Sequence, residues 1–277
     1  NLIAYIVLFS LVFGFLLSIC ADYLNISNLK ANLPDEVKDI YEAEKYKKSQ
    51  DYLRATTQLE LFSGGADLII ILLFWFAAGF NTLDHWLRGF GWGPVTTGIF
   101  FISILMFGQN LLSLPFKIYS TFVIEEKFGF NKMDVKTFWA DTFKSILLTC
   151  ALGTPILAGI LSFLEYAHED GWFYCWVATI LYMMALQFIA PTWIMPLFNK
   201  FEPLEDEQLK EAILSYSKSV SFPLKNIYVM DGSKRSSISN AFFTGFGKNK
   251  RIALFDTLLE GNSVKELVSV IAHEIGH

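Results

Sequence analysis

The chain has 277 residues, a net charge of −5, and 53% hydrophobic and 16% aromatic residues, more apolar side chain than an ordinary soluble domain carries. The slight acidity identifies no partner, and the sequence has no basic aromatic patch, which argues against a nucleic-acid-binding protein. The three cysteines, Cys20, Cys150 and Cys175, all fall in apolar stretches and are interpreted as small core residues, which excludes a disulfide or cysteine–metal framework.

Five long segments of the chain carry almost no charge. Charged residues are missing from four of them, and only Asp67 interrupts the other. Each segment supplies the roughly 20 apolar residues that an α-helix needs to cross a bilayer. The sequence therefore predicts a polytopic α-helical protein embedded in the lipid bilayer. The predicted spans lie within residues 2–21, 61–83, 89–116, 145–164 and 171–199.

The first span does not resemble a signal peptide, because the chain opens on Asn1 without a basic leading region or a small-residue cleavage site. We expect both termini to be trimmed. The segments between successive spans lie on alternating sides of the membrane. Of the 22 Lys and Arg residues, 21 lie in the segments on one side. The positive-inside rule makes that face cytoplasmic, and it places the N-terminus outside.

Two features of the membrane region bear on function. Residues 34–59, between the first two spans, are charged with apolar residues at helical spacing, which predicts a cytoplasmic amphipathic helix. Gln109, Asn110 and Gln187 lie inside predicted spans. Polar side chains at that depth either line a water-filled cavity or form hydrogen bonds between helices, and the sequence leaves both open.

After residue 190 the composition becomes that of a soluble domain. We therefore divide the chain into a transmembrane region, residues 1–190, and a second domain, residues 191–277. The pair Lys234 and Arg235 is interpreted as part of a solvated loop. The second domain is predicted to contain a helix over 205–220 and strands over 227–230, 240–246 and 251–255, the last two joined by a hairpin loop at 247–250.

A capping box marks the start of the last helix. Ser263 is followed three residues later by Glu266, the pattern in which the hydroxyl and the carboxylate each satisfy a free N–H group. The residues that follow are largely apolar, with polar exceptions near the end of the chain. The sequence therefore predicts a mostly buried helix that carries those polar residues.

The polar residues on this helix form an H-E-x-x-H motif. His273 and His277 are four residues apart, so they lie one turn apart on one helix face and are able to bind one zinc ion. Glu274 is turned by about 100° from His273, which lets its carboxylate reach a water activated by the metal without becoming a ligand. The motif therefore predicts a Zn²⁺ site with His273 and His277 as ligands and Glu274 as the catalytic residue.

A catalytic zinc site needs a third protein ligand and leaves a fourth position for water. No residue upstream of the motif is a persuasive candidate. We expect the third ligand beyond residue 277, and we expect the chain as it stands to be inactive because it ends within the site.

Several blocks of the sequence, in addition to the zinc motif, resemble the type I CAAX prenyl proteases, which are integral-membrane zinc metalloproteases. The similarity covers most of the chain in the family's order. The blocks are Phe122–Asn131, Pro196–Phe201, Lys234–Ser237 with Ser239–Ala241, and Arg251–Leu259.

The resemblance implies a mainly α-helical fold with seven transmembrane helices in the full-length protein, five of them here, around a large water-filled chamber. It implies a small α+β zincin-like metalloprotease domain, of which residues 191–277 are the N-terminal part. Its implied activity is zinc-dependent cleavage of the C-terminal tripeptide of prenylated CAAX proteins. An edge strand would bind the prenylated or extended peptide, and we expect Ser239, Asn240, Ala241 and Phe242 to contact that substrate.

Two other functions stay open at this point. One is a membrane quality-control metalloprotease that acts on misfolded or unprenylated proteins. The other is a non-enzymatic scaffold or transporter, which has no need for Glu274 between two histidines. The membrane is expected to be the inner membrane of a bacterium or that of the endoplasmic reticulum, depending on the source, with the protease domain on the cytoplasmic side.

Overall fold

The computed structural model describes residues 2–29, 33, 42–166, 170–245 and 250–276. The chain forms two compact units, residues 1–129 and 130–277, which are described separately below. The division into domains at residue 190 stays a prediction. Five helical segments in the described residues are long and apolar enough to cross a membrane, as the sequence predicts. They are Leu2–Asn28, Ala43–Phe76, Pro94–Glu125, Val135–Tyr166 and Gly171–Leu197.

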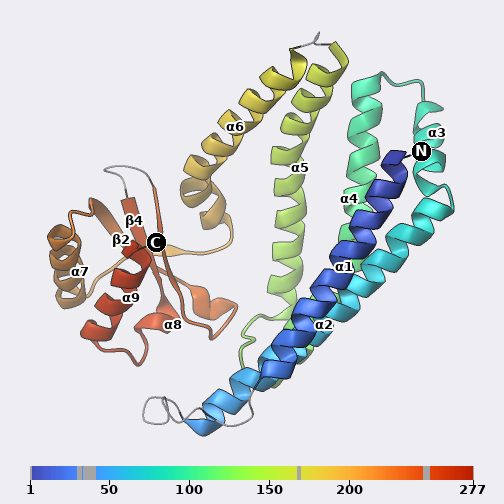
Figure 1. Cartoon of the computed structure of the whole chain (residues 1–277). Coiled ribbons are helices and arrows are strands. Elements are labelled where there is room, and N and C mark those ends of the chain that lie inside the picture. Colours follow the sequence, from blue (N-terminus) through green and yellow to red (C-terminus); the bar gives the residue numbers. More distant parts are fainter. Residues whose placement is uncertain (1, 30–32, 34–41, 167–169, 246–249, 277) are drawn as a thin grey trace. The chain divides into compact units, whose positions relative to one another are not determined.

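The described residues of the first unit form helices joined by short turns, with no strand among them (Figure 1). Helix α1 packs along α2, and α4 contacts both α2 and α3. Their exposed surfaces are covered with large apolar side chains, as expected for helices that face lipid. The elements are α1 (Leu2–Asn28), α2 (Ala43–Phe76), α3 (Gly79–Arg88), α4 (Pro94–Tyr119) and the π-helical η2 (Ser120–Glu125).

The nearly uncharged stretch 61–83, within which the second span was predicted, is not one continuous helix. Helix α2 stops at Phe76, and Ala78 adopts a left-handed conformation with φ of 57° before α3 begins. Hydropathy does not detect this break because the residues on both sides of it are apolar. At its other end α2 starts at Ala43, so the part of the predicted amphipathic helix that is described is continuous with the span; residues 34–41 lie outside the described residues.

The second unit begins with two long helices, α5 (Val135–Tyr166) and α6 (Gly171–Ile189), which contact each other. The Tyr182 hydroxyl of α6 donates to the Leu152 carbonyl of α5 at 2.5 Å. Beyond α6 the chain winds through a π-helical turn, η3 (Ala190–Ile194). Pro191 lies in this turn and lacks the N–H that a regular α-helix would require, which accounts for the change of winding.

The rest of the second unit is a four-stranded sheet with helices (Figure 1). The strand order is β1-β2-β4-β3; β2 and β4 are parallel, and the two outer pairs are antiparallel. The strands are β1 (Phe201–Pro203), β2 (Leu224–Met230), β3 (Ala241–Thr244) and β4 (Lys250–Phe255). The helices are η4 (Met195–Leu197), α7 (Glu207–Ser219), η5 (Gly232–Lys234), α8 (Asp256–Leu259) and α9 (Val264–Gly276).

The predicted elements of this region are confirmed in kind. Helix α7 starts after Asp206, whose carboxylate accepts from the Leu209 N–H at 3.0 Å. Strands β3 and β4 pair antiparallel as the hairpin prediction requires, although residues 246–249 of the connecting loop lie outside the described residues. The three-residue strand β1 was not predicted, because it is too short to show an alternating pattern.

One face of the sheet packs against α7 and α9 and forms the core of the unit. Ile213, Leu254 and Ile271 are fully buried there, one each from α7, β4 and α9. Ala241 of β3 belongs to the same cluster. The core therefore fixes α9 beneath the edge of the sheet, and the fold as a whole is mainly α-helical with a small α+β part, as the resemblance implied.

Candidate active site

The predicted capping box starts helix α9. The Ser263 N–H donates to Glu266 Oε2 at 2.7 Å, and the Glu266 N–H approaches Ser263 Oγ at 3.5 Å. The Ser263 hydroxyl also donates to Glu266 Oε2 at 2.7 Å. These hydrogen bonds, from the hydroxyl first and the backbone second, lower the pKa of Glu266 below its usual value. The carboxylate is therefore held in its charged form at the N-terminus of the helix that carries the motif.

Helix α9 presents two of the motif residues at its C-terminal end. Leu267 and Ile271 bury one side of the helix in the core, whereas His273 is exposed and Glu274 is half-buried. His277 lies outside the described residues. No group of three His, Cys, Asp or Glu side chains with metal-binding geometry occurs among the described residues, so the predicted ligand set stays a prediction.

The described part of the motif, His273 and Glu274, fits one metal ligand and the catalytic base of a zinc site. α9 is regular to Gly276, His273 is exposed on it, and the Glu274 carboxylate comes from the next residue of the same turn. An imidazole and a neighbouring carboxylate on a helix anchored by its opposite side are the donor and the base that such a site uses. If zinc binds here, His273 and His277 are the predicted residues to hold it.

The residues expected to bind substrate lie at one edge of the sheet. Ala241 and Phe242 belong to β3, which ends the strand order next to β4. Ala241 is buried and shares the core with α9, which contacts β3 directly. The far edge of β3 pairs with no strand among the described residues, and an unpaired edge of this kind is one that an extended peptide can join.

Ser239 and Asn240 precede β3 and fix where it begins. The Ser239 hydroxyl donates to the Thr257 carbonyl at 2.9 Å, and the Asn240 carbonyl accepts from the Phe255 N–H at 3.0 Å. The Asn240 side chain accepts from the Ala241 N–H at 2.9 Å. Both residues therefore anchor the edge strand to the end of β4 and to α8, a structural role that does not depend on substrate.

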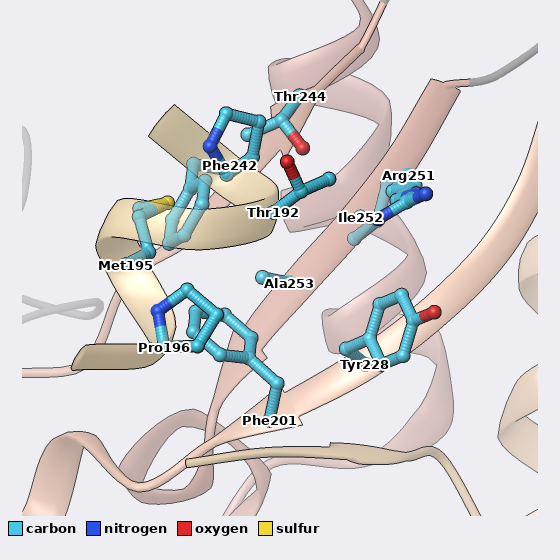
Figure 2. Close-up of a pocket in the computed structure, with 11 residues that line it drawn as sticks. Thr192, Met195, Pro196, Phe201, Tyr228, Phe242, Thr244, Arg251, Ile252 and Ala253 are labelled. Atoms are coloured by element: carbon cyan, nitrogen blue, oxygen red, sulfur yellow. The ribbon is translucent and has the colours of Figure 1, made fainter. Parts of the chain in front are cut away.

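A cavity of about 180 Å³ lies on the opposite face of the sheet (Figure 2). Tyr228, Ala253 and Phe242 are aligned across β2, β4 and β3 on this face, and Arg251 pairs with Thr244 beside them. The turns that follow α6 form the other wall. The remaining lining residues are Pro191, Thr192, Met195, Pro196, Phe201 and Ile252. Phe242 thus connects the edge strand with a mostly apolar cavity, a feature that the sequence did not reveal.

The prediction of a solvated loop at Lys234 and Arg235 agrees with the exposure of Lys234 but is wrong for Arg235. Its side chain is only 18% exposed, and its Nε donates to Asp141 Oδ2 at 2.7 Å. Its Nη2 donates to the Phe198 carbonyl at 2.6 Å. The sequence gives no signal for this pair because 94 residues separate its members. The prediction failed because a pair of basic residues between two strands usually faces solvent.

The polar residues of the third predicted span do not bond across helices in the described structure. The Asn110 side chain donates to the Met106 carbonyl of its own helix at 2.9 Å. The Gln109 side chain lies 3.5 Å from the Ser113 hydroxyl, one turn further along α4. Both side chains are exposed in this unit.

The comparisons with known proteins agree with this architecture. A family model described as CAAX prenyl protease N-terminal, five membrane helices, matches residues 22–200, and one described as Peptidase family M48 matches residues 203–277. CAAX prenyl protease 1 of Saccharomyces cerevisiae is 40% identical over 266 residues, which are 92% of this chain and 58% of that protein. The Homo sapiens CAAX prenyl protease 1 homolog is 38% identical over 240 residues, which are 84% of this chain and 50% of that protein.

A solved structure shows the same fold over nearly the whole chain. The crystal structure of S. mikatae Ste24p superimposes with a TM-score of 0.90 at 39% identity and covers 99% of this chain and 66% of that one. The chain thus spans between half and two thirds of the length of these relatives. The match extends over both the membrane helices and the sheet with its motif helix, and the chain belongs to the CAAX prenyl protease family, Peptidase family M48.

Proposed function

We propose that the protein is a zinc-dependent membrane endopeptidase that cleaves the C-terminal tripeptide of prenylated CAAX proteins or related peptides. One observation carries the proposal: α9 brings His273 and Glu274 to the end of a helix that packs against the edge strand β3. Family membership and the names of the relatives support the substrate class.

In this proposal Glu274 is the catalytic residue. Its carboxylate accepts a proton from the attacking water and delivers that proton to the leaving amine. His273 and His277 hold the zinc, which when bound polarises the scissile carbonyl and makes water a stronger nucleophile at neutral pH. The burial of Ile271 supports this assignment, because it fixes the rotation of α9 and hence the direction in which Glu274 projects.

The edge strand β3 aligns the substrate in this proposal. An extended peptide pairs with the main-chain groups on the outer edge of β3, apart from the Ala241 N–H that already donates to Asn240, and this pairing provides affinity without reading side chains. Alternate side chains of such a peptide point to the face of the sheet that carries Phe242 and the adjoining cavity. An apolar residue of the peptide is the group that this cavity suits.

The membrane placement follows the distribution of charge. We infer that the N-terminus is outside and that residues 191–277 lie on the cytoplasmic side, because 21 of 22 Lys and Arg residues fall in segments on that face. A cytoplasmic site suits prenylated proteins, which reach the membrane from that side.

Quality-control proteolysis is the competing function within the same chemistry. Its substrates would be misfolded or unprenylated proteins. Five membrane helices before the motif favour the CAAX assignment. A scaffold or transporter without activity is disfavoured by Glu274, because a carboxylate between two histidines has no purpose in a passive bundle.

The test compares substrates with the protein expressed from its full-length gene and loaded with zinc. The three substrates are a farnesylated CAAX peptide, the same peptide without the lipid, and an unfolded unmodified protein. We expect kcat/KM for the farnesylated peptide to exceed that for the bare peptide at least about tenfold, since each buried CH₂ group contributes about 0.8 kcal/mol. Equal cleavage of all three would favour quality control, and no cleavage by zinc-loaded protein would favour the scaffold.

A further inference from the structure

Arg235 and Asp141 form an ion pair away from the motif helix. The Arg235 Nε–Asp141 Oδ2 distance is 2.7 Å, and the two side chains are 18% and 16% exposed. The second hydrogen bond of the guanidinium goes to the Phe198 carbonyl, which follows η4. One side chain therefore joins three segments: the loop between β2 and β3, helix α5, and the turn that leads into β1.

Backbone contacts reinforce the same junction. The Arg235 carbonyl accepts from the Lys132 N–H at 3.0 Å, and the Ser237 N–H donates to the Phe130 carbonyl at 2.9 Å. Lys144, one turn along α5 from Asp141, donates to the Leu197 carbonyl at 2.8 Å. The loop is thus fixed against both the segment before α5 and the helix itself.

The other end of this loop leads directly to the edge strand. The Thr257 hydroxyl donates to the Ile238 carbonyl at 3.2 Å, and Ser239 bonds back to the Thr257 carbonyl. β3 starts two residues later at Ala241. Because the strand order is β1-β2-β4-β3, the loop must pass over the end of β4 to reach the edge of the sheet. Its position therefore determines where β3 begins.

Stability alone does not explain why a charged pair occupies this junction. The Arg235 Nη1 atom is buried and has no hydrogen-bond partner in the part of the chain that the structure describes. A shielded ion pair with one donor uncompensated recovers little of its desolvation cost, and apolar residues of similar volume stabilise such a place as well or better. What the pair adds is geometry. The N–H groups of the planar guanidinium point in fixed directions, which restricts where its two acceptors can lie.

We propose that Arg235 is a positioning residue, which fixes the loop of residues 232–240 against α5 and thereby holds β3 in its position beside α9. The proposal rests on the proposed function in that β3 is taken to align the peptide before Glu274. When Arg235 is replaced, β3 opens more often while α9 stays packed through Ile271. Peptide alignment is lost in the bound complex as well as in the transition state, so KM rises more than kcat falls.

The experiment combines hydrogen exchange with kinetics on the full-length protein. We expect Arg235→Gln to speed amide exchange in residues 236–244 about tenfold and to leave residues 264–276 within about twofold. The ratio kcat/KM falls about tenfold or more, mainly through KM, with an unchanged zinc content. Arg235→Lys keeps the charge but not the two-acceptor geometry, so its exchange and KM lie between those of Gln and the parent.

The first unit offers a matched control. Arg88 Nε lies 2.7 Å from Asp84 Oδ2, the same pair at the same distance, but these side chains are 65% and 35% exposed. We expect Arg88→Gln to change neither exchange near β3 nor KM. Asp141→Asn provides a second route to the same loss if Arg235→Gln fails to fold.

Three results would overturn the proposal. They are unchanged exchange in residues 236–244, an equal increase over α9 and β4 that marks a general loss of stability, and a kcat effect without a KM effect. The exchange measurement does not require cleavage. If the parent cleaves no peptide, the proposed function fails while selective opening of β3 still supports the positioning role.

Discussion

Replacement of Ile271 by Ala tests whether α9 is held in place by its apolar side. Ile271 is fully buried against Leu254 and Ile213. Truncation of a fully buried Ile costs about 3.5 kcal/mol in transfer and cavity terms. Ala is the better helix former by about 0.4 kcal/mol, which leaves a loss of about 3 kcal/mol. That loss is a large fraction of the stability of a small domain.

Hydrogen exchange measures this loss directly. At about 1.4 kcal/mol per tenfold, amides of β4 and α9 whose exchange requires opening of the core should exchange about 150-fold faster in Ile271→Ala. Ile271→Val should raise the exchange rates of the same amides about fivefold. Lys265→Ala, at an exposed position of the same helix, should change these rates about twofold or less. An Ile271→Ala rate within threefold of the parent, roughly 0.7 kcal/mol, would refute the packing assigned to α9.

Two further predictions concern the start of α9 and the loop after β2. The pKa of Glu266 is lowered by hydrogen bonds from Ser263, so its contribution to stability is present above the usual carboxyl pKa and is lost as the pH falls through the lower folded value. Protection factors in the first turn of α9 should therefore fall in acid, and Glu266→Gln should abolish that pH dependence. A methyl group on Gly232 would overlap the Phe255 ring. Gly232→Ala should lower the free energy of unfolding by about 1–3 kcal/mol, measured by denaturant titration, whereas Gly159→Ala, which meets no neighbour, should not.

Patterns that depend on many residues could be predicted from the sequence. The five spans follow from long uncharged stretches, and the hairpin of β3 and β4 follows from two apolar runs around a polar loop. The capping box of Ser263 and Glu266 is local, so it forms the hydrogen bonds that the sequence predicts. In each case the signal is repeated along the chain or confined to a single helical turn.

Features that depend on single residues or distant pairs could not be predicted. The end of α2 depends on one left-handed residue, Ala78, within an apolar stretch. The pairing of Arg235 with Asp141 joins residues 94 positions apart, and composition cannot distinguish it from two surface charges. The cavity at Phe242 depends on the order of the strands in the sheet. The apolar patterns of β2 and β4 do not indicate that these two strands pair in parallel.

The most direct test of the central claim is the turnover of Glu274→Gln at matched zinc content, measured on the full-length protein with the farnesylated peptide. Gln keeps the size of the side chain but cannot take the proton, so we expect one zinc per chain, an unchanged fold, and a kcat at least about 10²-fold below the parent. Turnover near that of the parent in the zinc-loaded variant would contradict the role of Glu274 and with it the proposed mechanism.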